Sequence, residues 1–167
     1  MTAALDWQGF ADITHMNVRK AGPDEEKTLT LDLKLIAECK GDVLGFFDDS
    51  LATFLFLPDG SLRMPAMEPV SWAGEVKHMR LDVEGITFSD VTLRKFQFAP
   101  AENYNVALVM TATFTPERAE VALLAEFLGE SVKIVIEPEG DLFADVDKET
   151  GEVTPKKAAV QEEMRVE

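Results

Sequence analysis

The stretch from Asn105 to Gly140 constrains the fold most, because its residue pattern predicts a strand, a helix and a second strand in succession. Residues 106 to 112 alternate between two sets of apolar or small side chains, so both faces of this segment are largely apolar. Such a pattern is typical of a strand in the middle of a sheet. Residues 132 to 136 are mostly β-branched and are followed by Pro138 and Gly140, which indicates a second strand closed by a turn.

Between these strands the sequence predicts a helix from Pro116 to Leu128. Thr115 supplies an N-cap hydroxyl, and a proline at the first helical position loses no hydrogen bond. Gly129 can adopt the left-handed conformation that ends many helices. Apolar residues recur at helical spacing, so we expect a buried stripe of Val121, Leu124, Ala125 and Leu128, widened by Leu123 and Phe127.

An earlier stretch repeats this pattern when the chain is aligned with itself. At an offset of 77 residues, the alternating segment 29–35 falls on 106–112 in the same phase. At an offset of 80, Phe54 to Phe56 fall on Ile134 to Ile136, and Pro58 falls on Pro138. An internal duplication of strand, helix and strand is one interpretation. Chance similarity between two strand patterns is the other, and both remain open at this point.

The middle of the chain predicts antiparallel strands. Residues 76–83 and 91–98 alternate in the manner of strands, with a short strand at 86–88, and Glu84 and Gly85 between them form a hairpin signal. The apolar phase shifts between Leu93 and Phe96, which indicates a β-bulge near Arg94 and Lys95 or burial on both faces. A first strand is expected at 13–18, paired with the one that begins near residue 29.

The length and composition bound the domain organisation. At 167 residues and 46% hydrophobic content, the chain can bury one sizeable core. We therefore expect an α+β fold with a mostly antiparallel sheet and one main helix over residues 1–146. Residues 147–167 are polar, and we expect them to form a flexible tail.

The charge and the cysteine content indicate what kind of protein this is and in which cellular compartment we expect it. The formal net charge is -15, and residues outside 139–167 still hold 22 acids against 12 bases, so the folded body is itself acidic. The single Cys39 cannot form an intramolecular disulfide and no motif frames it as a nucleophile, so a buried or incidental thiol is expected. The sequence shows no secretory signal pattern and no apolar run long enough to span a bilayer. We expect a cytoplasmic protein without membrane contact.

Catalytic, cofactor and metal patterns are sparse. His15 and His78, the only histidines, fall on expected strands and would meet if those strands paired. Asp145, Asp147 and Glu149 alternate as in a calcium loop, but the loop's glycine and terminal glutamate are missing at the required spacing. No phosphate-binding glycine loop, nucleophile elbow or zinc-finger spacing is present. We predict no enzyme activity, no cofactor, no catalytic residue and no metal site.

Two binding functions remain. The first is recognition of a basic, nucleic-acid-handling protein by an acidic face, in the manner of a mimic of DNA charge. The alternative is binding of single-stranded nucleic acid by cations near aromatic rings, and its candidate residues are Arg63, Trp72, Lys77, Arg80, Arg94 and Lys95. Ordinary solubility also accounts for the acidity, and core packing also accounts for the aromatics. The oligomeric state is open.

Several segments carry a resemblance to known proteins: His15–Lys20, Leu33–Leu35, Val43–Phe47, Lys77–Met79, Val91–Phe96 and Ala125–Leu128. In these segments the chain resembles small, uncharacterised proteins encoded by tailed phages and prophages, over most of residues 12 to 140. The resemblance includes no catalytic motif and therefore transfers no functional residue. It implies a phage setting inside a bacterial host cell, where acidic inhibitors of host defence and accessories of replication or recombination are both common.

Overall fold

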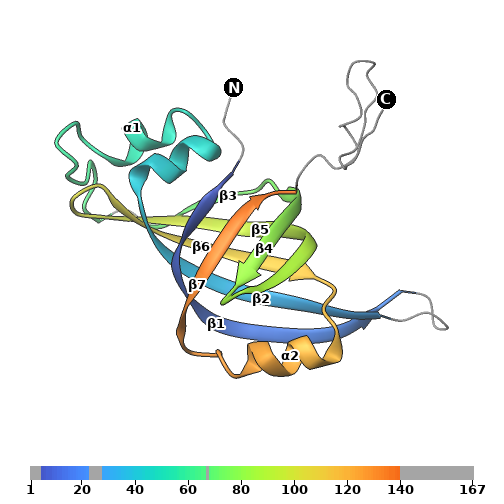
Figure 1. The fold of residues 1–167 in the computed structure, drawn as a ribbon. Helices are drawn as coiled ribbons and strands as arrows, with labels where there is room; N and C mark the ends of the chain where they lie inside the picture. The colour runs from blue at the N-terminus through green and yellow to red at the C-terminus, as the bar shows by residue number, and fades with distance from the viewer. Residues whose placement is uncertain (1–4, 23–27, 67, 140–167) are drawn as a thin grey trace, which may run out of the picture.

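The computed structural model describes residues 5–22, 28–66 and 68–139, and its main feature is one seven-stranded sheet (Figure 1). Every pairing between its strands is antiparallel. The fold is thus α+β and mainly β, with small helices. The strands are β1 (Trp7–Ala21), β2 (Thr28–Lys40), β3 (Val70–Trp72), β4 (Val76–Val83), β5 (Ile86–Ala101), β6 (Asn105–Phe114) and β7 (Ser131–Pro138).

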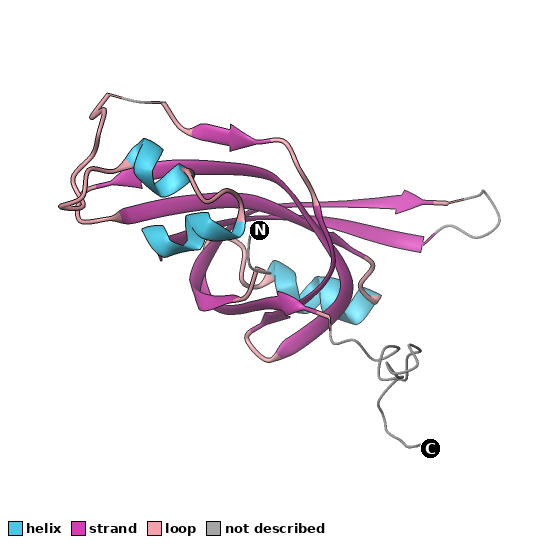
Figure 2. Ribbon diagram, turned by 90° about the horizontal axis from the view of Figure 1, so that it is seen from above, coloured by secondary structure: helices cyan, strands magenta, loops and turns pink. Residues whose placement is uncertain are grey.

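The sheet closes on itself. The order β5, β4, β7, β1, β2, β6 is completed by a pairing between β6 and β5, so six strands form a cylinder (Figure 2). The short strand β3 pairs with the second half of β5, beyond the part of β5 that pairs with β4. Closure gives each of the six long strands a partner on both sides over part of its length, which protects those backbone groups from edge-to-edge association. The second half of β1, after Asp12, pairs with β2 alone.

The interior of the cylinder is a packed apolar core. Alternate residues of each strand point inward, because successive side chains of a strand lie on opposite faces. On the paired strands β2 and β6, Leu33 lies opposite Ala112 and Leu35 opposite Met110, and all four are fully buried. Burial of each large apolar side chain contributes roughly 1.5 to 3 kcal/mol. The core also includes Ile13, Leu81, Leu93, Phe96, Phe98, Leu108, Ile134 and Ile136.

The predicted duplication is not shown. The two alternating segments are direct neighbours in the sheet, but the second strand expected at Phe54 to Phe56 is absent. Instead, residues Leu51–Leu55 form helix α1, and Phe56 makes only an isolated bridge to Leu62. Local bonds explain the helix, since the Asp48 carboxylate accepts from the Ser50 backbone N–H and the Phe54 N–H donates to the Ser50 carbonyl.

A helical insert connects β2 to β3. It begins with the 3-10 helix η1 (Gly41–Phe46), continues through α1 and holds the tip of the β5–β6 hairpin at Tyr104. The Gly41 N–H donates to the Tyr104 carbonyl at 2.8 Å, and the Tyr104 N–H donates to the Gly60 carbonyl at 2.9 Å. The Tyr104 ring packs beside Phe56 with 4.8 Å between ring centroids. These contacts fix the insert against the sheet.

Helix α2 (Arg118–Ala125) is shorter than the predicted 116–128 and lies at the bottom of Figure 1. Its N-cap is Glu117, not Thr115, because Glu117 and Glu120 form a reciprocal capping box. The expected stripe is correct at Leu124, which is fully buried, and wrong for Leu123, Ala125 and Leu128, which are exposed. The helix ends before Leu128, so that residue lies in the following turn. Gly129 has the expected positive φ of 84°.

The middle of the chain follows the prediction closely. Strand β4 has the predicted bounds, and Glu84 and Gly85 both have positive φ, as a tight hairpin requires. The two strands expected at 86–88 and 91–98 are one continuous strand, β5. The predicted bulge is confirmed, since the β5–β6 register shifts between Arg94 and Gln97, and Lys95 has a φ of 59°.

Strand β1 begins six residues before the expected Ile13, because the segment from Trp7 to Asp12 pairs with β7. The predicted boundary at residue 146 and the tail at 147–167 lie outside the described residues. Within the described ranges, no helix has the length and apolar character needed to cross a membrane.

Candidate functional site

Three of the six candidate nucleic-acid-binding residues lie apart from the others. Arg63 belongs to the helical insert, where its guanidinium donates to the backbone carbonyls of Thr53 at 2.9 Å and Phe56 at 3.3 Å. Arg80 forms an ion pair with Glu137 across β4 and β7 at 2.9 Å. Lys77 is exposed on β4 and lines neither of the grooves described below. Arg63 and Arg80 therefore have structural partners.

The other three candidates, Trp72, Arg94 and Lys95, do come together. They line one groove of about 410 Å³ between β3 and the bulge of β5, with Ser71 and Gln97. Its far wall is apolar, because the Trp72 ring packs edge-on against Phe96 at 5.5 Å and against Phe47 at 5.2 Å. Trp72 is thus half-buried and mainly a packing residue, with part of its surface open to solvent.

A second groove, of about 340 Å³, crosses the outside of β1, β2, β6 and β5. It shares Arg94, Lys95 and Gln97 with the first, so the two are continuous around the bulge. We call the combined surface the outer groove. The part that sequence reasoning missed is lined by His15, Asn17, Asp32, Lys34, Val109 and Thr111. Only strand pairing reveals it, because these residues lie far apart in the chain.

The floor of the outer groove is a hydrogen-bonded network around Asp32. Its carboxylate accepts from Arg19 Nε at 3.0 Å, Thr113 Oγ1 at 2.7 Å and Arg94 Nη2 at 3.4 Å. Burial opposes ionisation, but the hydrogen bonds from Arg19, Thr113 and Asn17 and the charge of Arg19 outweigh it and lower the pKa of Asp32 to about 2. Asp32 is therefore ionised and neutralised by cations. The exposed charged side chains that remain in the outer groove are Lys34, Lys95 and the carboxylate of Glu75.

The helical insert carries a pocket of about 530 Å³. We call it the insert pocket. Phe56, Leu57 and Tyr104 form its apolar wall, and Asp59 and Arg63 lie at its rim. Leu57 is 37% exposed and Tyr104 36%, and on the same insert Phe54 and Met64 are each 49% exposed. Four of the eight exposed large hydrophobic residues found in the described ranges thus belong to the insert and the hairpin tip it holds.

The insert is also acidic, with Arg63 as its one basic residue among those described. Residues 41–62 contain Asp42, Asp48, Asp49 and Asp59 and no lysine or arginine. Hydrogen bonds from the Ser50 hydroxyl and N–H lower the pKa of Asp48, and those of Ser61 do the same for Asp59. Both carboxylates are charged at neutral pH and held in fixed positions. The surface of the insert therefore combines negative charge with exposed apolar side chains.

The histidines and the cysteine occupy separate places. His15 lies on β1 and His78 on β4, and β7 runs between these strands, so the pairing that would bring the histidines together does not occur.

Cys39 is buried on β2. Desolvation is the main cause that raises the pKa of its thiol to about 12, and the charges of Glu38 and Asp42 add to it. The expectation of a buried thiol is confirmed.

Among the described residues, one set of metal-ligating types lies close together: His78, Asp90 and Glu139. The calcium-like segment at Asp145 to Glu149 lies outside the described part of the chain.

We compared the chain with protein-family models, with curated proteins and with solved structures, and none of the three comparisons gave a match.

Proposed function

We propose that this protein binds a basic, nucleic-acid-handling protein, and that the helical insert is the surface that does so. The observation that carries the proposal is the coincidence, on residues 41–62 and Tyr104, of four aspartates with exposed apolar side chains. Exposed apolar groups gathered on one segment are typical of interaction surfaces. Surrounding carboxylates favour a partner with lysine and arginine around an apolar anchor.

The net charge of the whole domain also favours a basic partner. The described residues hold 20 acids against 11 bases, so a basic partner is attracted over the range of the Debye length and nucleic acid is repelled. The only basic residue at the insert pocket, Arg63, is hydrogen-bonded to two backbone carbonyls of the insert. The resemblance to phage proteins leads us to propose a host protein in the bacterial cytoplasm as the partner.

Affinity purification from a bacterial lysate with the full chain tests this proposal. The test variant combines Phe54→Ser with Leu57→Ser, which removes exposed apolar surface from the insert. The matched control combines Leu123→Ser with Leu128→Ser, which are 46% and 50% exposed near α2. We expect a basic protein to be retained by the wild type and the control and lost with the insert variant, while thermal melts show that all three are folded.

The purified partner then gives the salt dependence of the dissociation constant. We expect affinity to weaken steadily as salt rises, because the Debye length shortens from about 10 Å at 0.1 M to about 3 Å at 1 M. Neutralising Asp42→Asn and Asp49→Asn together should flatten that dependence. Retention of the same proteins by the insert variant, or a partner of acidic composition, would contradict the proposal.

The second candidate function is binding of single-stranded nucleic acid in the outer groove. The observation in its favour is that Lys34, Arg94 and Lys95 line one continuous surface that ends at Trp72, on a domain that is otherwise acidic. A cationic groove with a partly open aromatic ring is how proteins hold single strands without sequence preference.

Fluorescence anisotropy with labelled oligothymidylate separates the two candidates. Lys34→Glu with Lys95→Glu is the test variant, and Arg118→Glu on α2 with Lys133→Glu on β7 is the control of equal net charge. Arg94 is left intact because it supports Asp32. If the outer groove binds DNA, the test variant loses binding and the control keeps most of it. If oligothymidylate does not bind the wild type at about 0.1 M salt, this second candidate is wrong.

A further inference from the structure

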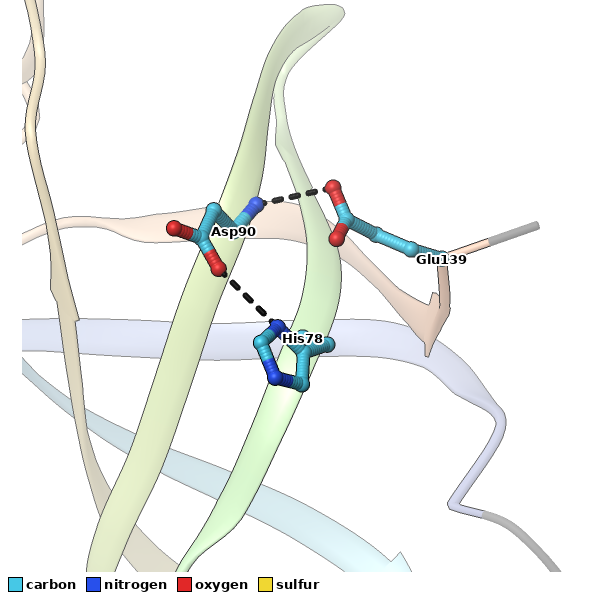
Figure 3. A group of neighbouring side chains, drawn as sticks. All are labelled: His78, Asp90 and Glu139. Atoms are coloured by element: carbon cyan, nitrogen blue, oxygen red, sulfur yellow. Dashed lines mark hydrogen bonds and ion pairs between the residues drawn. The ribbon is translucent and has the colours of Figure 1, made fainter. Parts of the chain in front are cut away.

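His78, Asp90 and Glu139 meet at one edge of the cylinder, although they belong to three separate strands or strand ends (Figure 3). His78 lies on β4, Asp90 on β5 and Glu139 directly after β7. One potential ligand atom from each residue lies within 4.8 Å of the other two. Sequence reasoning considered His78 only together with His15, and did not single out Asp90 or Glu139, since 12 residues separate His78 from Asp90 and 49 separate Asp90 from Glu139.

The backbone aims these side chains at one another. His78 and Asp90 have φ values of 60° and 55°, and the β4–β5 register shifts on either side of Met79, so both residues lie in bulges. A bulge re-aims a side chain relative to a regular strand. In Figure 3 the imidazole of His78 faces the carboxylate of Asp90, with His78 Nδ1 and Asp90 Oδ1 3.2 Å apart.

Backbone hydrogen bonds tie the third residue to the other two. The Asp90 N–H donates to Glu139 Oε2 at 2.9 Å, and the Glu139 N–H donates to the His78 carbonyl at 3.1 Å. Within the described ranges these bonds use only one oxygen of Glu139, which leaves its other oxygen for a ligand. The three groups are therefore positioned before any ligand arrives, which lowers the entropy cost of binding.

The charge balance at this edge favours a cation. Asp90 and Glu139 place two carboxylates close together, and within the described ranges neither is paired with a lysine or an arginine. The nearby Arg80 is engaged by Glu137. Two neighbouring carboxylates repel each other unless a positive charge lies between them. The imidazole of His78 faces Asp90, and an imidazole is itself a metal ligand when neutral.

We propose that His78, Asp90 and Glu139 bind one divalent transition-metal ion of the Zn²⁺ class. An imidazole nitrogen with two carboxylate oxygens suits zinc and its neighbours, whereas magnesium and calcium prefer oxygen ligands alone. Ligands about 2.0 to 2.2 Å from zinc lie roughly 3.5 Å apart in a tetrahedron. The 3.2 Å between His78 and Asp90 is close to that spacing, and Glu139 offers a ligand atom within 4.8 Å of both. Both His78 and Asp90 are largely exposed, so the remaining coordination position faces water.

Isothermal titration calorimetry of the full chain with ZnCl₂ tests the site. The variants are His78→Asn, Asp90→Asn and Glu139→Gln, since asparagine tolerates the left-handed backbone and glutamine keeps an acceptor for the Asp90 N–H. The control is His15→Asn, which removes the other exposed histidine. Cys39 is buried and does not contribute.

We expect one zinc ion per chain, bound more than about tenfold more weakly by each site variant and unchanged in the control. Zinc should raise the melting temperature of the wild type and the control, but not that of Glu139→Gln. Excess MgCl₂ should not displace it. Equal zinc affinity in the wild type and His78→Asn, or an equal loss in His15→Asn, would overturn the proposal. These outcomes are independent of the partner-binding test.

Discussion

Asp32 on β2 and Thr113 on β6 lie directly opposite each other in the sheet, and the Thr113 hydroxyl donates to the Asp32 carboxylate at 2.7 Å. Thr113 Oγ1 in turn accepts from Arg94 Nε at 3.2 Å, while Arg19 donates to Asp32 from the other side. The pair therefore joins β1, β2, β6 and β5 on the outer face of the cylinder. The network stabilises the closed sheet and fixes the cations of the outer groove.

The low pKa of Asp32 predicts a loss of stability in acid. Because its folded-state pKa is about 2, below the ordinary value of 3.8, its contribution is fully present above about pH 4 and is lost as pH falls through about 2. Asp32→Asn should cost about 1 kcal/mol at pH 7, given that solvent screens the half-exposed Arg19. Urea unfolding at pH 7, 4 and 2.5 measures this. A difference between wild type and variant that does not shrink in acid would contradict the assignment.

Leu124 and Leu123 provide a matched test of how α2 packs. Leu124 is fully buried and Leu123 is 46% exposed, although they are adjacent on one helix. Leu124→Ala should cost roughly 2 to 5 kcal/mol by opening a cavity beneath the helix, and Leu123→Ala should cost less than about 0.5 kcal/mol. Denaturant unfolding of both variants decides the matter. Equal losses would mean that the helix is rotated relative to this description.

Gly41 and Gly45 test the contact between the insert and Tyr104. A Cβ at Gly41 would lie 2.8 Å from Tyr104 Cζ, whereas a Cβ at Gly45 meets nothing within 4 Å. Gly41→Ala should therefore cost roughly 1 to 3 kcal/mol through overpacking, and Gly45→Ala should be neutral or slightly stabilising. In a Tyr104→Ala background the cost of Gly41→Ala should largely disappear. If that cost persists, the close approach to Tyr104 is not its cause.

The sequence predicted local structure better than long-range arrangement. The limits of β4, the hairpin at Glu84 and Gly85 and the bulge at Lys95 follow from alternation and turn chemistry over short distances. Closure of the sheet did not follow, because it depends on the pairing of β2 with β6 and of β7 with β1 and β4, strands that are far apart in the chain. Alternation alone does not specify which strand becomes whose neighbour.

The residues of the candidate surfaces were likewise predictable only where they lie close together in the sequence. Trp72, Arg94 and Lys95 were predicted and do share a groove, but Lys34 and His15 reach it only through pairing across β1, β2 and β6. The segment at Phe54 was expected to form a strand, because three apolar residues in a row fit a strand as well as a helix. In the structure the Asp48 carboxylate accepts from the Ser50 N–H and hydroxyl in the turn just before α1, and residues 51–55 form that helix as part of the insert surface.

Because Cys39 is buried, we predict that its thiol reacts slowly with disulfide reagents. Its pKa of about 12 leaves almost no thiolate at neutral pH, and its side chain is closed off from solvent. Reaction with a disulfide reagent at pH 8 should be at least about a hundredfold slower in the native protein than in urea, since reaction requires local opening. Absorbance of the released thiolate measures both rates. Similar rates would contradict the buried position on β2.

Site-specific photo-cross-linking tests the central claim most directly, because it asks which face touches the partner. A benzophenone amino acid replaces Phe54 on the insert or Leu123 on α2, two positions of similar exposure at 49% and 46%. After irradiation in a bacterial lysate, we predict that position 54 becomes joined to a basic protein, in a yield that falls as salt rises, and that position 123 gives little product. Equal yields at both positions, or cross-links mainly to nucleic acid, would contradict the account.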